Sequence, residues 1–332
     1  MNILVVRTDK LGDFVTALPT LYVLKQYNPE NRIIACIAPL NQQLALACPF
    51  IDEVIVDEGR SIWTLVSKLR NAKIDASITL FSNTRVALAQ FLAGIATRIA
   101  PATKLAQFFY NRRIKQRRSR VEMAEFEYNL QLAKVLFSDI DQDFPKPLCE
   151  FSKDELDVSY QKFCDMYAVS KPVIAFHPGF GGSSDANWTL QEYVELVKIA
   201  SDNPDVQAVM TFGPGEEDLY TQSIELCEGL DVIFYNSKEG IVEFTKLLAS
   251  FKLFVSTSTG TYHLAALVNT PTMTFFGDSL FASAKRWKSV SDEKLQMNRM
   301  IPLEATKRAA FFEKTKAELL SWVQKHQTPS AG

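Results

Sequence analysis

The stretch Ile3-Leu4-Val5-Val6 runs directly into Arg7-Thr8-Asp9-Lys10-Leu11-Gly12-Asp13, and a helical pattern follows from Phe14. The apolar run predicts a buried strand, and the polar residues after it predict a strand-to-helix turn. In an open parallel sheet, ligands bind outside the carboxyl ends of the strands. Asp13 is therefore a candidate for chemistry at the first such turn. The simpler alternative is that Asp13 caps the helix that starts at Phe14.

Composition indicates a globular chain of about two domains, because it has 332 residues of which 47% are hydrophobic. The net charge of −2 and a pI near 6.0 give no support for a nucleic-acid binder that uses its whole surface. The chain opens on a strand without a leader pattern, so we expect a cytoplasmic protein. Its five cysteines are scattered and form no C-x-x-C pair, which indicates neither a disulfide framework nor a zinc site. The longest uncharged apolar run, residues 86–97, is shorter than the roughly 20 residues that a membrane span needs.

Short apolar runs alternate with amphipathic segments along both halves of the chain. This alternation predicts βαβ units and parallel sheets, an α/β fold. A segment rich in Pro and Asp, Ser138–Glu150, reads as a linker, so we expect domains at 1–150 and 151–332. Helices are predicted at Asp154–Tyr167 and at Glu304–His326, and the second of these can pack back on the first domain. The predicted strands are Ile3–Arg7, Arg32–Ala38, Val54–Asp57, Ala76–Leu80, Val173–His177, Val206–Thr211, Val232–Tyr235, Leu253–Ser256 and Thr272–Phe276.

Two loops in the second half follow predicted strands and carry glycines. The first is Pro178-Gly179-Phe180-Gly181-Gly182, where backbone N–H groups could approach an anion, although an ordinary glycine turn would look the same. Beyond it, Thr189 and Glu192 have the spacing of a capping box. The second loop is Gly213-Pro214-Gly215-Glu216-Glu217. One of its acids could hold ribose hydroxyls, or both could be first-turn helix acids.

A third loop, Ser258-Thr259-Gly260-Thr261-Tyr262-His263, follows the strand at Leu253–Ser256. Hydroxyl groups and free N–H groups at a helix N-terminus form an anion site, and a histidine one turn later could add a positive charge. The alternative is that His263 is a structural histidine in the helix.

Eight cationic residues and no acid lie between Arg98 and Arg120, beside Phe108-Phe109-Tyr110. Such a segment suits an anionic, amphiphilic partner, such as phosphorylated sugars on a lipid at a membrane surface. A solvated basic loop and a nucleic-acid site are the alternatives. The cations are Arg98, Lys104, Arg112, Arg113, Lys115, Arg117, Arg118 and Arg120.

Together these motifs resemble those of glycosyltransferase family 9, the bacterial ADP-heptose:lipopolysaccharide heptosyltransferases. The resemblance rests on residues 7–13 with Leu18-Pro19, His177-Pro178-Gly179 with Trp188, Thr259-Gly260-x-x-His263 and Phe276-Gly277. It implies a GT-B fold of two facing Rossmann-like domains with a cleft between them. It also implies inverting sugar transfer from ADP-heptose to a lipopolysaccharide inner-core acceptor, with Asp13 as general base.

The resemblance also implies which residues bind each substrate. The acceptor side is expected at Arg112, Arg113, Lys115, Arg117, Arg118 and Arg120, on a protein associated peripherally with the inner face of the membrane. The donor side is expected at Lys10, Gly12, His177, Gly179, Gly181, Gly182, Gly213, Glu217, Ser258, Thr259, Gly260 and His263. We expect a nucleotide sugar and a phosphorylated lipid-linked oligosaccharide as partners, and no nucleic acid.

We expect no metal or other cofactor, because Asp139-Ile140-Asp141-Gln142-Asp143 lies in the linker and reads as solvated charge. Two positions depart from the family pattern: Ser258 stands where an acid is usual, and Ala186 where a lysine or arginine is frequent. These departures leave open another nucleotide sugar, a nucleotide-sugar epimerase, or a non-catalytic nucleotide-sugar-binding module.

Overall fold

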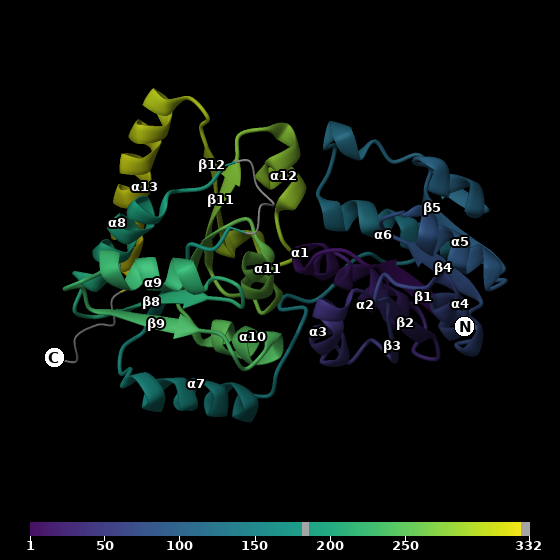
Figure 1. Cartoon of the computed structure of the whole chain (residues 1–332), viewed down its shortest axis with the longest axis horizontal. Helices are drawn as coiled ribbons and strands as arrows, with labels where there is room; N and C mark the ends of the chain where they lie inside the picture. The colour runs from purple at the N-terminus through teal and green to yellow at the C-terminus, as the bar shows by residue number, and fades with distance from the viewer. Residues whose placement is uncertain (181–185, 327–332) are drawn as a thin grey trace. The chain divides into compact units, whose positions relative to one another are not determined.

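The structure is a computed structural model, and it describes residues 1–180 and 186–326 (Figure 1). The chain divides into two compact units, Met1–Leu148 and Cys149–Gly332. The division falls inside the segment Ser138–Glu150, in which the structure has neither helix nor strand. Among the described residues, no helix is both long and apolar enough to cross a membrane.

The first unit is built on a parallel six-stranded sheet in the order β3-β2-β1-β4-β5-β6. Leu4 and Val6 of β1 lie in a core with α4 and α5, whereas α2 and α6 contact each other and the strands β2 and β5. The sheet therefore has helices on both faces. The strands are β1 (Asn2–Arg7), β2 (Arg32–Ile37), β3 (Glu53–Val56), β4 (Ala76–Thr79), β5 (Thr97–Pro101) and β6 (Arg112–Ile114). The helices are α1 (Leu11–Val15), α2 (Leu18–Tyr27), α3 (Gln42–Leu46), α4 (Ile62–Asn71), α5 (Thr84–Leu92) and α6 (Glu125–Leu136).

The second unit repeats this architecture, with the strand order β12-β11-β10-β7-β8-β9. One face of its sheet packs on α8, α9 and α13, and the other carries α10, whose Phe244 ring meets Phe254 of β10. The strands are β7 (Val173–His177), β8 (Gln207–Phe212), β9 (Val232–Asn236), β10 (Leu253–Thr257), β11 (Thr272–Gly277) and β12 (Gln296–Ile301). The helices are α7 (Lys153–Tyr167), α8 (Leu190–Ser201), α9 (Glu217–Leu226), α10 (Ile241–Ser250), α11 (Gly260–Leu267), α12 (Ala284–Trp287) and α13 (Ala305–Lys325).

Both sheets have the strand order of a nucleotide-binding Rossmann sheet, in which the connections reverse direction beside the first strand. The reversal lies between β1 and β4 in the first unit and between β7 and β10 in the second. The predicted catalytic and donor residues lie at or just after the carboxyl ends of β1, β7, β8 and β10, whereas the predicted acceptor residues lie on and after β6. The doubly wound α/β class is confirmed, and each sheet brings its candidate residues to the edge where such folds bind ligands.

All nine predicted strands are present, within two residues at each end, and so are the helices at α7 and α13. Three strands were not predicted: β5, β6 and β12. The C-terminal helix α13 buries Phe312, Leu319 and Val323 in the core of the second unit.

The first helix begins earlier than predicted, at Leu11 rather than Phe14, and it ends at Val15. A second helix, α2, starts at Leu18 with Pro19 in its first turn. Proline fits a first turn but cannot donate to the carbonyl four residues before it, which favours the observed break between the two helices.

Candidate active site

A buried arginine organises the carboxyl end of β1. Arg7 is only 2% exposed, and its guanidinium contacts three carboxylates. Its Nε donates to Asp9 Oδ1 at 2.8 Å, one terminal nitrogen donates to Asp13, and the other donates to Glu125 Oε1 at 3.3 Å. Arg118 adds a second cation, since it forms an ion pair with Glu125. We call Arg7, Asp9, Asp13, Glu125 and Arg118 the Arg7 cluster.

Asp13 lies inside α1 rather than before it. The residue that precedes the helix is Lys10, whose side chain makes no capping hydrogen bond. The alternative that Asp13 caps a helix starting at Phe14 is therefore wrong. The Asp13 side chain keeps 17% of its surface exposed while Arg7 holds one of its oxygens, so the structure presents a fixed carboxylate with solvent access.

The charges of the Arg7 cluster perturb one another. Burial would lower the pKa of Arg7, but Asp9, Asp13 and Glu125 raise it above its ordinary value. Burial and the charge of Asp13 raise the pKa of Asp9 to about 6, against the opposing effect of Arg7. Asp9 therefore takes up a proton more readily than an ordinary aspartate.

In the second unit, the loops after β7 and β8 meet at His177. The ring is buried, its Nδ1 lies 2.9 Å from the Thr211 carbonyl, and its Nε2 lies 3.7 Å from Glu216 Oε1. Burial lowers the pKa of His177, although the Glu216 carboxylate opposes this shift. Glu216 Oε2 also accepts from the backbone N–H of Gly213 at 2.7 Å.

Gly179 packs directly against this pair. A Cβ at position 179 would lie 2.0 Å from Glu216 Oε1 and 2.6 Å from His177 Nε2, so only glycine fits here without a shift of these side chains. Glu217 begins α9 and accepts from the Gly215 N–H at 3.3 Å. Of the two acids considered for this loop, the structure thus brings Glu216 to His177. Gly181 and Gly182 lie outside the described residues.

The residues after β10 are buried as far along the chain as Thr259. Ser258 and Thr259 are each 8% exposed, and the hydroxyls of Thr259 and Thr261 lie 2.9 Å apart. The helix α11 starts at Gly260, with Thr259 in the N-cap position. The Ser258 N–H is already used by the Phe275 carbonyl at 2.9 Å, so the N–H groups left for a ligand are those of the first helical turn.

His263 is a neutral, buried residue. It is 3% exposed, its Nδ1 lies 2.9 Å from the Ser289 hydroxyl, and burial lowers its pKa to about 3. Of the two alternatives for His263, the structure therefore favours a structural histidine over one that adds a positive charge at the helix end. The capping box predicted beyond the first loop is confirmed, because Thr189 and Glu192 accept each other's backbone N–H groups.

The two departures from the family pattern lie in ordered, buried positions. Ser258 follows β10, and Ala186 is part of the hydrophobic core of the second unit together with Trp188. Arg286 in α12 is a buried cation of the same unit, with its guanidinium 3.5 Å from the centre of the Phe281 ring.

The basic segment has two kinds of cation. Arg112, Arg113, Lys115, Arg117 and Arg120 are exposed on β6 and the turn that follows it. Arg118 differs, because its side chain is 15% exposed and pairs with the buried Glu125 of the Arg7 cluster. The first sheet therefore carries exposed positive charge at one edge strand, joined through Arg118 to the residues around Asp13.

Lys10 and Gly12 lie beside Asp13 in the first unit, at the start of α1. Within the described residues, no three histidine, cysteine or acidic side chains are arranged to hold a metal ion. Of the linker acids, Asp139 accepts from the Tyr27 hydroxyl at 3.0 Å, and Asp141 accepts from the Asp143 N–H at 3.1 Å.

Comparison with known proteins agrees with this architecture. The profile of glycosyltransferase family 9 (heptosyltransferase) matches residues 62–316. A protein of Haemophilus influenzae, named only provisionally as a glycosyltransferase, is 37% identical over 301 residues, which cover 88% of this chain and 86% of that protein. Lipopolysaccharide heptosyltransferase 1 of Salmonella typhimurium is 24% identical over 302 residues, which cover 83% and 88% respectively.

A solved structure of E. coli ADP-heptose lps heptosyltransferase II has the same fold. Its TM-score is 0.75 at 22% identity, over 97% of this chain and 99% of that one. The two doubly wound units and these matches define a glycosyltransferase with the GT-B fold. The chain belongs to glycosyltransferase family 9, the heptosyltransferase family.

Proposed function

We propose that this protein is an inverting glycosyltransferase that transfers heptose from ADP-heptose to a lipopolysaccharide inner-core acceptor. The observation that carries the proposal is the Asp13 carboxylate, held by Arg7 at the carboxyl end of β1 and still accessible to solvent. Membership of the heptosyltransferase family supports the type of sugar, and the E. coli relative is named for ADP-heptose.

In the proposed step, Asp13 takes the proton of an acceptor hydroxyl while the hydroxyl oxygen bonds to the anomeric carbon of the donor sugar. The bond from that carbon to the nucleoside diphosphate breaks, and the configuration inverts. General-base catalysis of this kind contributes typically 10²–10⁴-fold to a rate. The step needs no covalent intermediate, and we propose that it needs no metal or other cofactor.

The departing diphosphate requires positive potential. We propose that it binds at the start of α11, where Thr259, Gly260 and the following N–H groups offer donors at the positive end of a helix. Since burial keeps His263 neutral, its role there is to donate or accept a hydrogen bond rather than to supply charge. For the ribose hydroxyls we propose Glu216 or Glu217, which lie side by side after β8.

The acceptor is proposed to be a phosphorylated lipid-linked oligosaccharide. Exposed cations on and after β6 suit its phosphate groups, and the same cations suit attachment to the anionic inner face of the cytoplasmic membrane. An epimerase acting on the nucleotide sugar would not need this basic surface. Ser258 and Ala186 keep a different nucleotide sugar, or loss of catalysis, as second candidates.

The direct test is a transfer assay with purified protein, ADP-heptose and a lipid-linked inner-core acceptor, with product mass as the readout. We expect one heptose to be added with inverted configuration in the presence of a metal chelator. Transfer from a different nucleotide sugar would keep the enzyme class and reassign the donor. Release or epimerisation of the sugar without an acceptor product would overturn the proposed reaction.

A further inference from the structure

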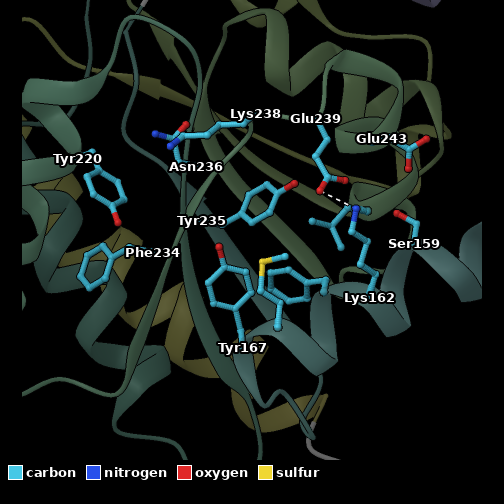
Figure 2. A pocket seen from close by; sticks show the side chains of 13 residues that line it. Ser159, Lys162, Tyr167, Tyr220, Phe234, Tyr235, Asn236, Lys238, Glu239 and Glu243 are labelled. Atoms are coloured by element: carbon cyan, nitrogen blue, oxygen red, sulfur yellow. Dashed lines mark hydrogen bonds and ion pairs between the residues drawn. The ribbon is translucent and has the colours of Figure 1, made fainter.

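A cavity of about 300 Å³ lies in the second unit, at the edge strand β9 (Figure 2). Its walls come from α7, α9, β9, the residues after β9 and the first turns of α10. None of the residues that line it belongs to the candidate donor loops at 177–179, 213–217 or 258–263. Its size is at the lower end of the roughly 300–1,000 Å³ that small-molecule pockets occupy.

Aromatic rings form most of the apolar lining, and all but one of the contacting pairs meet edge to face, the exception being Phe163 and Tyr167, which are tilted at 43°. Tyr167 and Tyr235 have ring centroids 6.1 Å apart at 70°, and Phe163 meets Tyr235 at 5.6 Å and 75°. At the other end, Tyr220 meets Phe234 at 6.3 Å and 80°. No pair of these lining rings is parallel, so the cavity offers single ring faces and edges rather than the flat slot that would sandwich a planar base.

Polar groups lie among these rings without using up their hydrogen-bonding capacity. Within the described part of the chain, the hydroxyls of Tyr167 and Tyr220 have no hydrogen-bond partner. Asn236, labelled in Figure 2, also lines the cavity and carries a side-chain amide. A buried or half-buried phenol usually finds a partner, so these hydroxyls are available to a ligand.

Charge at the cavity is balanced. Lys162 of α7 and Glu239 form an ion pair of 2.6 Å at one end, as Figure 2 shows. Lys238 and Glu243 also line the cavity, which gives two cations and two acids in total. Glu243 is already paired with Lys246 at 2.9 Å. A ligand with a strong charge of either sign therefore meets repulsion as well as attraction here.

We propose that this cavity binds a neutral sugar ring. A pyranose has an apolar C–H face that packs on one tyrosine ring and several hydroxyls that pair with the free phenols and with Asn236, which is the combination the cavity presents. Planar aromatic ligands lack a parallel-walled slot, and a phosphorylated sugar meets the acids Glu239 and Glu243 as well as the lining lysines. The site is separate from the proposed donor and acceptor sites, and it would give the protein a second contact with an oligosaccharide.

The test uses the full-length protein and saturation-transfer NMR followed by calorimetry. The probes are D-glucose, D-galactose, D-mannose and lactose, with glucose 6-phosphate and adenosine as comparators. We expect at least one neutral saccharide to bind in the millimolar range and more tightly than glucose 6-phosphate. The double variant Tyr167→Phe/Tyr220→Phe keeps the rings but loses two hydroxyls, and we expect it to weaken saccharide binding at least about tenfold.

The matched control is Tyr160→Phe, which removes a hydroxyl from the same helix, α7, but from outside the cavity lining. We expect it to bind saccharide as the parent protein does. Thermal stabilisation by ADP should be equal in all three proteins. The proposal is overturned if no neutral saccharide binds, if adenosine binds better, or if the double variant binds saccharide normally. Loss of ADP binding in the double variant would also overturn it, by making the cavity part of the nucleotide site.

Discussion

Arg7 accounts for the geometry of the candidate catalytic acid. A single guanidinium contacts three carboxylates, and two of them, Asp9 and Asp13, retain solvent access. Glu125 pairs with both Arg7 and Arg118. The buried Glu125 carboxylate therefore helps to fix the orientation of the Arg7 guanidinium. The sequence motif predicts Asp13, but it does not predict Glu125, since 118 residues separate it from Arg7 and only the fold brings them together.

The variant Asp13→Asn tests the proposed general base. It keeps the shape of the side chain and leaves Arg7 with two carboxylate partners, so we expect a folded protein with unchanged ADP affinity. Transfer should fall by roughly 10²–10⁴-fold, because the amide cannot take the proton. The rate is measured under saturating donor and acceptor.

Asp9→Asn is the matched control, since Asp9 contacts the same guanidinium and loses the same charge. We expect it to lower transfer less than tenfold. Equal losses in the two variants would mean that the charge of the cluster matters rather than one carboxylate, and near-normal turnover of Asp13→Asn would remove Asp13 from the mechanism.

His263 predicts a pH dependence of stability. Its pKa is lowered to about 3 in the folded protein, so below about pH 6.5 the unfolded chain binds a proton that the native state does not. Stability from this residue is therefore complete above pH 6.5 and falls as the pH drops toward 3, by at most about 1.4 kcal/mol per pH unit. The variant His263→Asn removes the titration, so the stability difference between the two proteins should shrink steadily from pH 6.5 to pH 4.

Urea denaturation at several pH values measures this difference. His326, which is exposed near the end of α13, provides the control substitution His326→Asn. We expect the control to keep the pH slope of the parent protein. A stability difference between parent and His263→Asn that does not change with pH would contradict a neutral, buried His263.

At the scale of elements, burial on both faces made several strands predictable, but it was not the only signal, because the half-buried edge strand β9 was predicted and the interior strand β5 was not. The strands β1, β2 and β7 are runs of apolar residues covered on both faces, and their boundaries follow from composition. The strand β6 has three residues, of which Arg112 and Arg113 are exposed, and β12 is half-buried and mixed in polarity. Both are edge strands, where only pairing with a neighbour on one side defines the element.

The basic segment contains exposed cations that are candidates for binding the acceptor, and one cation, Arg118, that pairs with the buried Glu125. Replacing Arg112, Arg113, Lys115, Arg117 and Arg120 by glutamine should change the free energy of unfolding little, because each side chain is exposed. Binding to vesicles that contain anionic lipid should fall by about 1 kcal/mol per removed charge, and acceptor turnover should fall with it. Flotation with vesicles and the transfer assay measure the two effects.

Arg118→Gln should behave in the opposite way. It removes one of the two cations paired with the buried Glu125, so we expect a loss of about 1–3 kcal/mol of stability and nearly normal vesicle binding.

If the five-residue variant keeps full activity on the nucleotide sugar and shows no lipid dependence, the epimerase alternative is favoured.

At the scale of the whole molecule, the two units share one strand order, and each has its own reversal point, the position at which doubly wound folds generally bind ligands. The sequence predicted this repetition because both halves alternate strand and helix in the same rhythm. The sequence could not predict that Glu216 faces His177. Two adjacent acids at the start of a helix are equally good candidates until the orientation of the helix relative to the sheet is known. We propose that the loops of the second unit determine donor identity, and this proposal is tested on the intact protein.

A thermal-shift screen with ADP, UDP, GDP and CMP should give the largest stabilisation with ADP. A nucleotide present at 100 times its Kd adds about 2.7 kcal/mol to the stability of the folded state. Gly179→Ala should lose this gain, because the added Cβ collides with Glu216 and His177. Gly94→Ala is the control, a glycine with open space but a φ of +80°. It should lower the melting temperature through backbone strain while keeping the full ADP shift. A larger shift with UDP or GDP would reassign the donor, and none with any nucleotide would favour a module without transfer activity.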